Sequence, residues 1–305
     1  MPESRVKIIH KCPTTTQLPI LNALTIDVED WYQLANRKLM GRFVPASPRV
    51  LTNTYWILDL LAKNNIRSTF FVLGRVAEQY PALVRCINGA GHEVATHGYS
   101  HSLVYHMGPE AFRTELVRSI NILEDITQRA VLGHRAPEIS INGNPEWAFE
   151  IMLEAGLNYD SSVFPIWHPR YGMPSYPRHP YVLQNTSGKM VEFPLATSSF
   201  LGINFPIAGG GYLRLLPFSL IRSGVYELNR QGYMAVLYVH PYEFDEEWLD
   251  LAIPSTSLRR KMNLRMRSIR RNWGRGRPMR AKFEALLGSF SFTSLSELVS
   301  HVQQQ

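Results

Sequence analysis

The sequence predicts an α/β fold, a distorted (β/α)7 barrel with a short C-terminal extension. Short runs rich in β-branched and aromatic residues alternate with longer segments whose apolar residues recur at helical spacing. This alternation predicts a mainly parallel sheet, because parallel strands need long crossover connections. No glycine-rich dinucleotide fingerprint follows the first predicted strand, where the acidic residues 27–31 stand instead. A barrel is therefore favoured over an open doubly wound sheet.

Seven short apolar strands are expected. They cover residues 22–28, 67–73, 92–96, 131–134, 157–161, 191–195 and 235–240. Five helices are expected between them, over residues 49–64, 75–89, 109–128, 145–155 and 217–230. Three of these helices begin at a proline, whose missing amide hydrogen costs nothing in a first helical turn. Residues 283–299 predict a further helix and strand that dock on the barrel.

The 305 residues divide into three expected segments: an N-terminal leader over residues 1–20, the barrel over 21–245 and a basic extension over 246–305. The leader has no apolar run of signal-peptide length, and the chain has no uncharged apolar stretch of about 18 residues. A cytoplasmic protein is expected. Cys12 and Cys86 match neither a disulfide framework nor a paired metal-binding motif.

The formal net charge of +7 is concentrated near the C-terminus, where residues 259–282 include eleven basic residues and no acidic one. The rest of the chain is mildly acidic. Three interpretations of this basic segment are open: a solvated surface, peripheral contact with an anionic membrane or a pyrophosphate-linked substrate, and a nucleic-acid site. Because no recognition motif accompanies the charge, nucleic acid is not an expected partner.

His97 and His101 form the strongest local signal. They flank a Gly-Tyr-Ser turn directly after the third predicted strand. Two imidazoles four residues apart can reach one cation, and neutral imidazole suits zinc and similar divalent ions. The alternative is a pair of structural histidines.

Three carboxylates, Asp27, Glu29 and Asp30, end the first predicted strand. They would repel one another unless a cation or solvent relieved the repulsion. Arg135 follows the fourth strand, where a guanidinium can orient a carboxylate and keep it ionised. His240 ends the seventh strand, where an imidazole can act as a general acid. Each signal is weak alone, but all lie at the carboxyl ends of strands, where a parallel barrel builds its active site.

In order along the chain, these motifs resemble the polysaccharide deacetylase family, also called the NodB homology or carbohydrate esterase family 4 group, over about residues 21–245. The segments that carry the resemblance are Leu24-Thr25-Ile26-Asp27, His97-x3-His101, Arg135-x-Pro137 and Leu237-Tyr238-Val239-His240. Further segments resemble deacetylases encoded with exosortase-type exopolysaccharide loci, which have a similar C-terminal extension: Asp27-Val28-Glu29-Asp30-Trp31, Tyr159-Asp160-Ser161-Ser162, Gly209-Gly210-Gly211-Tyr212 and His240-Pro241-Tyr242-Glu243.

The resemblance implies hydrolysis of the N-acetyl group of an amino sugar in an exopolysaccharide or its precursor. It implies a divalent metal, zinc first, with nickel, cobalt or iron(II) as alternatives. Asp27 would be the base for a metal-bound water, Arg135 its orienting partner and His240 the acid; His97 and His101 would bind the metal. The third ligand is open. Alternation along an extended strand favours Glu29, whereas a turn favours Asp30, which is our expectation.

Five residues are expected to contact substrate: Trp31, Tyr99, Pro137, Asp160 and Trp167. The expected partner is an N-acetylated glycan or a lipid-linked glycan precursor. The basic segment 259–282 would contact an anionic membrane, which places the protein in the cytoplasm with peripheral association at the inner membrane face. Two competing functions remain: a catalytically silent glycan-binding barrel, and a deacetylase-like hydrolase of another amide.

Overall fold

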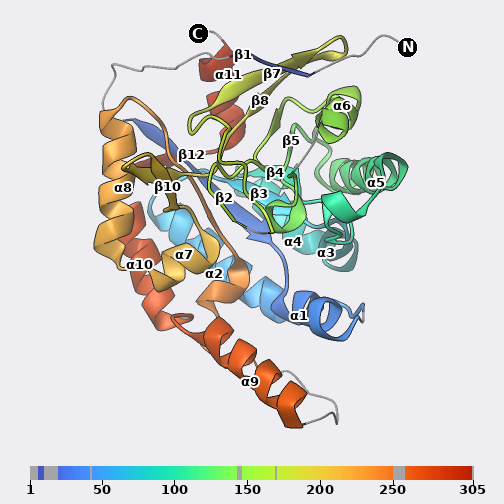
Figure 1. The fold of residues 1–305 in the computed structure, drawn as a ribbon. Coiled ribbons are helices and arrows are strands. Elements are labelled where there is room, and N and C mark those ends of the chain that lie inside the picture. The colour runs from blue at the N-terminus through green and yellow to red at the C-terminus, as the bar shows by residue number, and fades with distance from the viewer. Residues whose placement is uncertain are drawn as a thin grey trace.

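The computed structural model describes residues 6–9, 20–41, 43–142, 146–168, 170–249 and 258–303. A central sheet is surrounded by helices (Figure 1). Seven strands of this sheet run parallel, in the spatial order β8, β6, β5, β4, β3, β2 and β11. Their bounds are β2 (Leu21–Val28), β3 (Thr69–Val72), β4 (Glu93–Thr96), β5 (Gly133–His134), β6 (Tyr159–Asp160), β8 (Gly188–Glu192) and β11 (Val236–Val239). The expected α/β fold with a parallel sheet is confirmed.

The barrel is distorted at the gap between β8 and β11. Within the described residues these two strands do not pair, and a backbone hydrogen bond of 3.1 Å from Ala196 N to Val236 O crosses the gap. Side chains on both faces of the inner strands are buried, as the fully enclosed Phe70 and Phe71 of β3 illustrate. Burial on both faces explains why the strands are almost continuously apolar in sequence.

The connecting helices are α2 (Arg49–Lys63), α3 (Gly74–Gln79), α4 (Pro81–Gly89), α5 (Pro109–Thr127), α6 (Glu146–Glu154) and α8 (Phe218–Arg230), with short 3₁₀ turns η1 (Val104–His106), η2 (Pro137–Ile139) and η3 (Pro241–Phe244). The single helix expected over 75–89 is two helices. Tyr80 leaves the helical conformation and Pro81 starts α4, because proline restricts the residue before it and cannot continue the hydrogen-bond ladder. Pro145, the expected start of α6, lies outside the described residues.

Before residue 246, six α-helices and strands of the described part were not predicted: α1 (Trp31–Met40), α7 (Gly210–Leu215), β1 (Lys7–Ile9), β7 (Tyr181–Asn185), β9 (Thr197–Phe200) and β10 (Ile203–Pro206). β1 pairs with β7, and β7 pairs with β8, both antiparallel. Part of the expected leader is therefore a strand at the edge of the sheet. β9 and β10 form a separate hairpin.

The C-terminal region contains α9 (Leu258–Asn272), α10 (Arg277–Leu287), β12 (Ser291–Thr293) and α11 (Leu295–Gln303). β12 runs parallel to the first three residues of β2, just before the stretch of β2 that pairs with β3. Phe283 of α10 is fully buried, with its ring 5.0 Å from that of Phe244. The helix and strand expected near the end of the chain therefore dock on the barrel. None of the helices in the described part combines the length and apolar character needed to span a bilayer.

Candidate metal and active site

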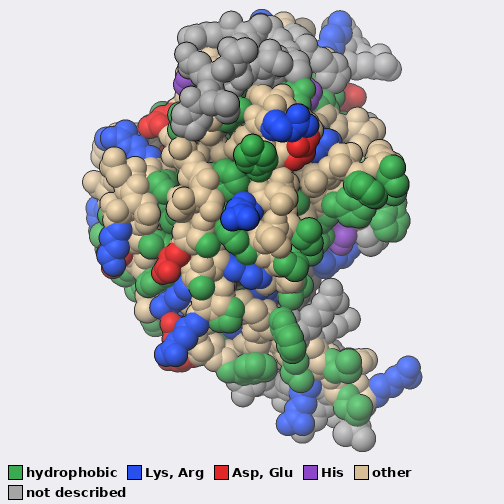
Figure 2. All heavy atoms as spheres, turned by 90° about the vertical axis from the view of Figure 1, so that its left-hand side faces the viewer, with side chains coloured by type: hydrophobic (Ala, Val, Ile, Leu, Met, Phe, Trp, Pro, Cys, Tyr) green, Lys and Arg blue, Asp and Glu red, His purple; other side chains and the backbone are tan. Residues whose placement is uncertain are grey.

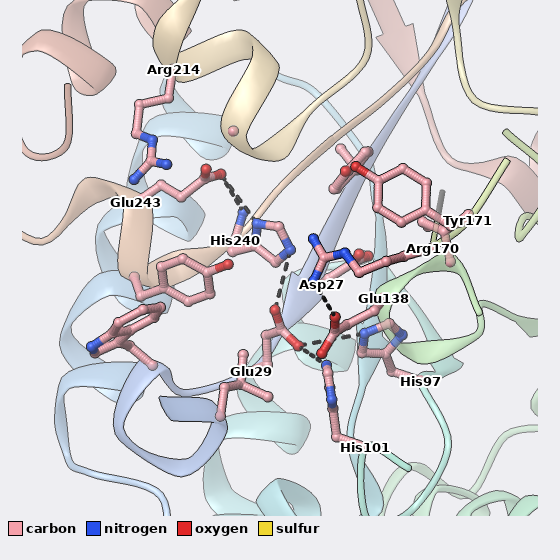
Figure 3. A pocket seen from close by; sticks show the side chains of 16 residues that line it. Asp27, Glu29, His97, His101, Glu138, Arg170, Tyr171, Arg214, His240 and Glu243 are labelled. Atoms are coloured by element: carbon pink, nitrogen blue, oxygen red, sulfur yellow. Dashed lines mark hydrogen bonds and ion pairs between the residues drawn. The ribbon is translucent and has the colours of Figure 1, made fainter. Parts of the chain in front are cut away.

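A cavity of about 270 Å³ opens where the parallel strands end (Figure 3). It is lined by residues at or after the ends of the four strands expected to carry the site, and by residues of other helices and loops. These lining residues are Asp27, Glu29, Trp31, Leu34, His97, His101, Glu138, Ile139, Arg170, Tyr171, Gly211, Arg214, Tyr238, His240, Tyr242 and Glu243. Small-molecule sites commonly have volumes of about 300–1,000 Å³. The cavity therefore suits a small group, such as one sugar unit of a longer chain.

Glu29, His97 and His101 meet on one side of this cavity (Figure 3). Each offers one ligand atom, and the three atoms lie within 4.8 Å of one another. Oε2 of Glu29 is 2.6 Å from Nε2 of His101 and 3.6 Å from Nε2 of His97. One carboxylate and two imidazoles with room for a further ligand match the donor set of catalytic zinc sites.

The hydrogen bonding of His97 and the negative charge of Glu29 suit a bound cation. The backbone carbonyl of Arg135 accepts a hydrogen bond of 2.8 Å from Nδ1 of His97, which leaves Nε2 free to coordinate. Oε2 of Glu29 is buried, and its close polar neighbours among the described residues are the Nε2 atoms of His97 and His101. Burial alone would raise the pKa of Glu29, but His101 and His240 outweigh it and hold the pKa well below its usual range. A buried, ionised carboxylate that faces two imidazole nitrogens is a suitable place for a divalent ion.

Asp30, the expected third ligand, lies elsewhere. Its carboxylate caps α1, accepting hydrogen bonds from the Gln33 amide at 3.1 Å, from the Ser47 amide at 3.1 Å and from the Ser47 hydroxyl at 2.7 Å. Asp30 keeps extended backbone angles, φ −107° and ψ 130°. The chain thus stays extended past β2, and alternation puts Glu29 on the same side as Asp27. The expectation of Asp30 is corrected to the alternative, Glu29.

Asp27 and Arg135 form a buried ion pair beside the three candidate ligands. Nη1 of Arg135 donates to Oδ1 of Asp27 at 2.8 Å and to the Thr25 hydroxyl at 2.6 Å. On its other side the guanidinium donates to the carbonyl and the hydroxyl of Ser161. The ring of Phe71 lies 4.3 Å from the guanidinium carbon. With every part of the guanidinium held, Arg135 fixes the carboxylate of Asp27 in one orientation.

His240 completes the cavity from the end of β11. Its Nε2 lies 3.2 Å from Oε1 of Glu29, and its Nδ1 lies 3.3 Å from Oε2 of Glu243. Glu243 also accepts a hydrogen bond from the His240 amide, so it fixes both the backbone and the ring. Burial by itself lowers the pKa of His240, but the charges of Glu29 and Glu243 raise it to about 9. At neutral pH the imidazole is therefore protonated and can donate.

Of the five expected substrate contacts, Trp31 lines the cavity and the other four do not. The Tyr99 hydroxyl instead donates to Glu78 at 2.9 Å. Pro137 is buried, while the next two residues reach the cavity. Trp167 is 80% exposed. Aromatic character predicts burial or stacking but not the direction of a side chain, which explains the positions of Tyr99 and Trp167.

Asp160 is fully buried and supports the loop that carries Arg135. Its Oδ1 lies 2.8 Å from Nδ1 of His134 and accepts a 2.8 Å hydrogen bond from the Ser162 hydroxyl. The same hydroxyl accepts from the Ala136 amide at 2.8 Å. Asp160 therefore helps to fix the backbone next to Arg135, through Ser162 and the Ala136 amide. We expected it to contact the substrate, but it does not line the cavity.

Several cavity residues were not expected: Glu138, Arg170, Tyr171, Arg214, Tyr242 and Glu243. Glu243 had a detectable signal, because an acidic residue three positions after a strand-end residue is the spacing of a capping box. The guanidinium of Arg170 lies 3.9 Å from the Glu138 carboxylate. Arg170 and Tyr171 come from an irregular loop, where neither strand nor helix periodicity indicates which side chains point inward.

Comparison with known proteins divides the chain into two matched parts. Residues 47–159 match the family model of polysaccharide deacetylases, and residues 161–300 match a domain of unknown function, DUF3473. A peptidoglycan-N-acetylglucosamine deacetylase of Bacillus cereus is 34% identical over 95 residues, which are 31% of this chain and 34% of that protein. A peptidoglycan deacetylase of Helicobacter pylori is 33% identical over 109 residues, 35% of this chain and 36% of that protein. The matched region spans about a third of each relative.

Solved structures support the fold across the whole chain. A Mycobacterium smegmatis protein assigned to the polysaccharide deacetylases has a TM-score of 0.60 at 22% identity, covering 98% of this chain and 96% of that one. The allantoinase PuuE has a TM-score of 0.57 at 14% identity, covering 93% and 90%. Because likeness at this level of identity shows the fold alone, the substrate has to be argued from the site.

Proposed function

We propose that this chain, whose residues 47–159 match the polysaccharide deacetylase family, is a metal-dependent hydrolase that removes the N-acetyl group from an amino sugar. The observation that carries the proposal is the meeting of Glu29, His97 and His101 beside the Asp27–Arg135 pair in one cavity. The named relatives, which act on N-acetylated glycans, support the choice of an acetamide over other amides.

An unstrained amide resists water, so the site must supply a nucleophile, stabilise the oxyanion and protonate the leaving amine. A divalent cation held by Glu29, His97 and His101, with zinc our first assignment and nickel, cobalt or iron(II) as alternatives, would supply Lewis acidity toward the acetyl carbonyl and acidify water. Asp27, fixed by Arg135, accepts the proton of the attacking water. His240 holds a proton at Nε2 and delivers it to the sugar nitrogen, a step typically worth about 10²- to 10⁴-fold in rate.

The finer identity of the substrate is part of the same proposal. We assign an exopolysaccharide or its lipid-linked precursor, handled at the inner face of the cytoplasmic membrane. The motif resemblance to deacetylases of exosortase-type loci supports this choice, and so does the basic segment 259–282, which suits an anionic membrane or a pyrophosphate link. Nucleic acid is not proposed as a partner.

The first test is metal stoichiometry on the stripped and reloaded full chain. About one zinc per chain is expected in the unmodified protein and in His240→Ala. No bound ion is expected in His97→Ala/His101→Ala, because two of its three ligands are missing. Failure of the unmodified protein to bind any divalent ion would rule out the proposed mechanism.

The second test is acetate release from N-acetylglucosamine oligomers. The zinc-loaded protein should release acetate, whereas His240→Ala should retain the ion and lose about 10²-fold or more of the rate. Oligomer binding without acetate release would instead establish a silent glycan-binding barrel. Hydrolysis of a ring amide without acetate release would establish a hydrolase of another amide.

A further inference from the structure

Helix α9 projects away from the rest of the fold (Figure 1). Among the side chains of α9 that the structure describes, two polar residues on one face fasten it to Leu249. Asn272, which is buried, accepts a hydrogen bond from the Leu249 amide at 3.0 Å and donates to the Leu249 carbonyl at 3.2 Å. Ser268, one turn earlier, donates to the same carbonyl at 3.4 Å. A different face of α9, roughly 110° around the helix axis from Ser268 and Asn272, is exposed.

This outer face carries an apolar stripe. Met262, Met266, Ile269 and Trp273 are 58%, 68%, 53% and 69% exposed. At about 100° per residue the four lie within an arc of roughly 60°. Trp273 belongs to the stripe although α9 ends one residue earlier, because its amide still donates to the Ile269 carbonyl at 3.1 Å. Four large apolar side chains in line and exposed are costly in water, which indicates a contact surface.

Basic residues flank the stripe. Arg259 and Arg265 are exposed, and helical spacing places them roughly 60° to either side of the Met262 direction. The segment 259–282 contains eleven basic residues and no acidic one. Figure 2 shows hydrophobic and basic side chains side by side at its lower edge. A charged helix of low mean hydropathy with a narrow apolar face is typical of helices that lie in the membrane interface.

Charge decides between the candidate occupants of this surface. A second copy of the chain would bring a second set of arginines against the first, and like charges across an interface are unfavourable. An anionic lipid surface complements the arginines, whose long side chains can reach headgroups while the stripe enters the acyl boundary.

We infer that α9 is an interfacial helix that inserts Met262, Met266, Ile269 and Trp273 into an anionic lipid surface. Leu249, to which α9 is fastened, packs with Trp31, and Trp31 lines the cavity. Docking of α9 therefore holds the cavity beside the lipid surface. This last step rests on the proposed function, because it brings a lipid-linked glycan to the site; the insertion itself does not depend on catalysis.

The test uses the full chain and vesicles of equal parts phosphatidylglycerol and phosphatidylcholine. The unmodified protein should co-sediment with these vesicles, and Met266→Ser/Ile269→Ser/Trp273→Ser should bind at least about tenfold more weakly. The matched control, Leu220→Ser/Tyr226→Ser, replaces exposed apolar residues of α8 (56% and 65% exposed) and should bind as the unmodified protein does. All three proteins should melt at the same temperature, since no buried contact is removed.

Three results of the vesicle assay would overturn the inference. The first is that the unmodified protein does not bind the vesicles, and the second is that the α8 control loses as much binding as the stripe variant. The third is that Arg259→Gln/Arg265→Gln weakens binding while the stripe variant does not, which would mean surface adsorption without insertion. A dimer that the stripe variant dissociates would also overturn it in favour of self-association. Acetate release is measured separately on soluble oligomers, so failure of the deacetylase proposal leaves this result unaffected.

Discussion

Replacing Arg135 with methionine should destabilise the protein by about 3–5 kcal/mol, the usual result of removing one partner from a buried ion pair. The variant leaves the carboxylate of Asp27, 2% exposed, without its 2.8 Å cation partner. Two of the other groups that Arg135 touches retain partners: the Thr25 hydroxyl donates to the Leu237 carbonyl, and the Ser161 hydroxyl donates to the Phe193 carbonyl. The Ser161 carbonyl loses its hydrogen bond from Nε, which is a smaller contribution than a buried charge. The ion pair should therefore account for most of the loss.

Urea unfolding of the metal-free protein, followed by tryptophan fluorescence, measures this loss. Arg113→Met is the matched control, because its pair with Glu154 is exposed (41% and 45%) and should contribute less than about 1 kcal/mol. In a double-mutant cycle, the loss in free energy of unfolding for Asp27→Asn/Arg135→Met should be smaller than the sum of the losses of the two single variants, by about 2 kcal/mol or more. A loss for Arg135→Met equal to that of the Arg113 control would refute the assignment of Arg135 as the residue that fixes Asp27.

Two further predictions concern the ligand choice and the pH dependence of stability. Glu29→Gln should abolish binding of one zinc ion per chain while Asp30→Asn keeps it, as measured by elemental analysis; the opposite pattern would restore Asp30 as the ligand. Burial lowers the pKa of His92 to about 4, so the unfolded chain, with a usual value near 6.5, binds the proton first and stability falls as pH drops from about 6.5 to 4. Over this pH range the free energy of unfolding of His92→Asn should fall by up to about 3 kcal/mol less than that of the unmodified protein, as measured by urea unfolding. Equal pH profiles for the two proteins would contradict this prediction.

The parallel strands were predictable because they carry two local signals, apolar runs and the helical segments between them. All seven expected strands correspond to strands of the sheet. Elements that depend on distant partners were missed. β1 is only three residues long, and it is a strand because it adds to β7, which itself depends on pairing with β8. Periodicity within a segment contains no information about such pairing.

In the site, sequence identified which strand ends matter but not which way each side chain points. Glu29 and Asp30 are adjacent, and the choice between them depended on one pair of backbone angles, at Asp30. Asp160 was selected for its place in a motif, whereas its contacts with His134 and Ser162 show a supporting position. A one-residue step along a strand reverses the face of the sheet, so a correct strand end with an uncertain boundary leaves the ligand undetermined.

The position of β2 explains why neither matched region contains the whole site. Asp27 and Glu29 precede residue 47, the two histidines of the candidate metal site lie within 47–159, and His240 lies within 161–300. β2 pairs with β3 on one side and β11 on the other, so its end receives His97 from beyond β3 and His240 from β11. β2 thus contributes the carboxylates around which both halves converge. A fragment limited to either half would lack Glu29, so both halves and β2 are required to assemble the cavity.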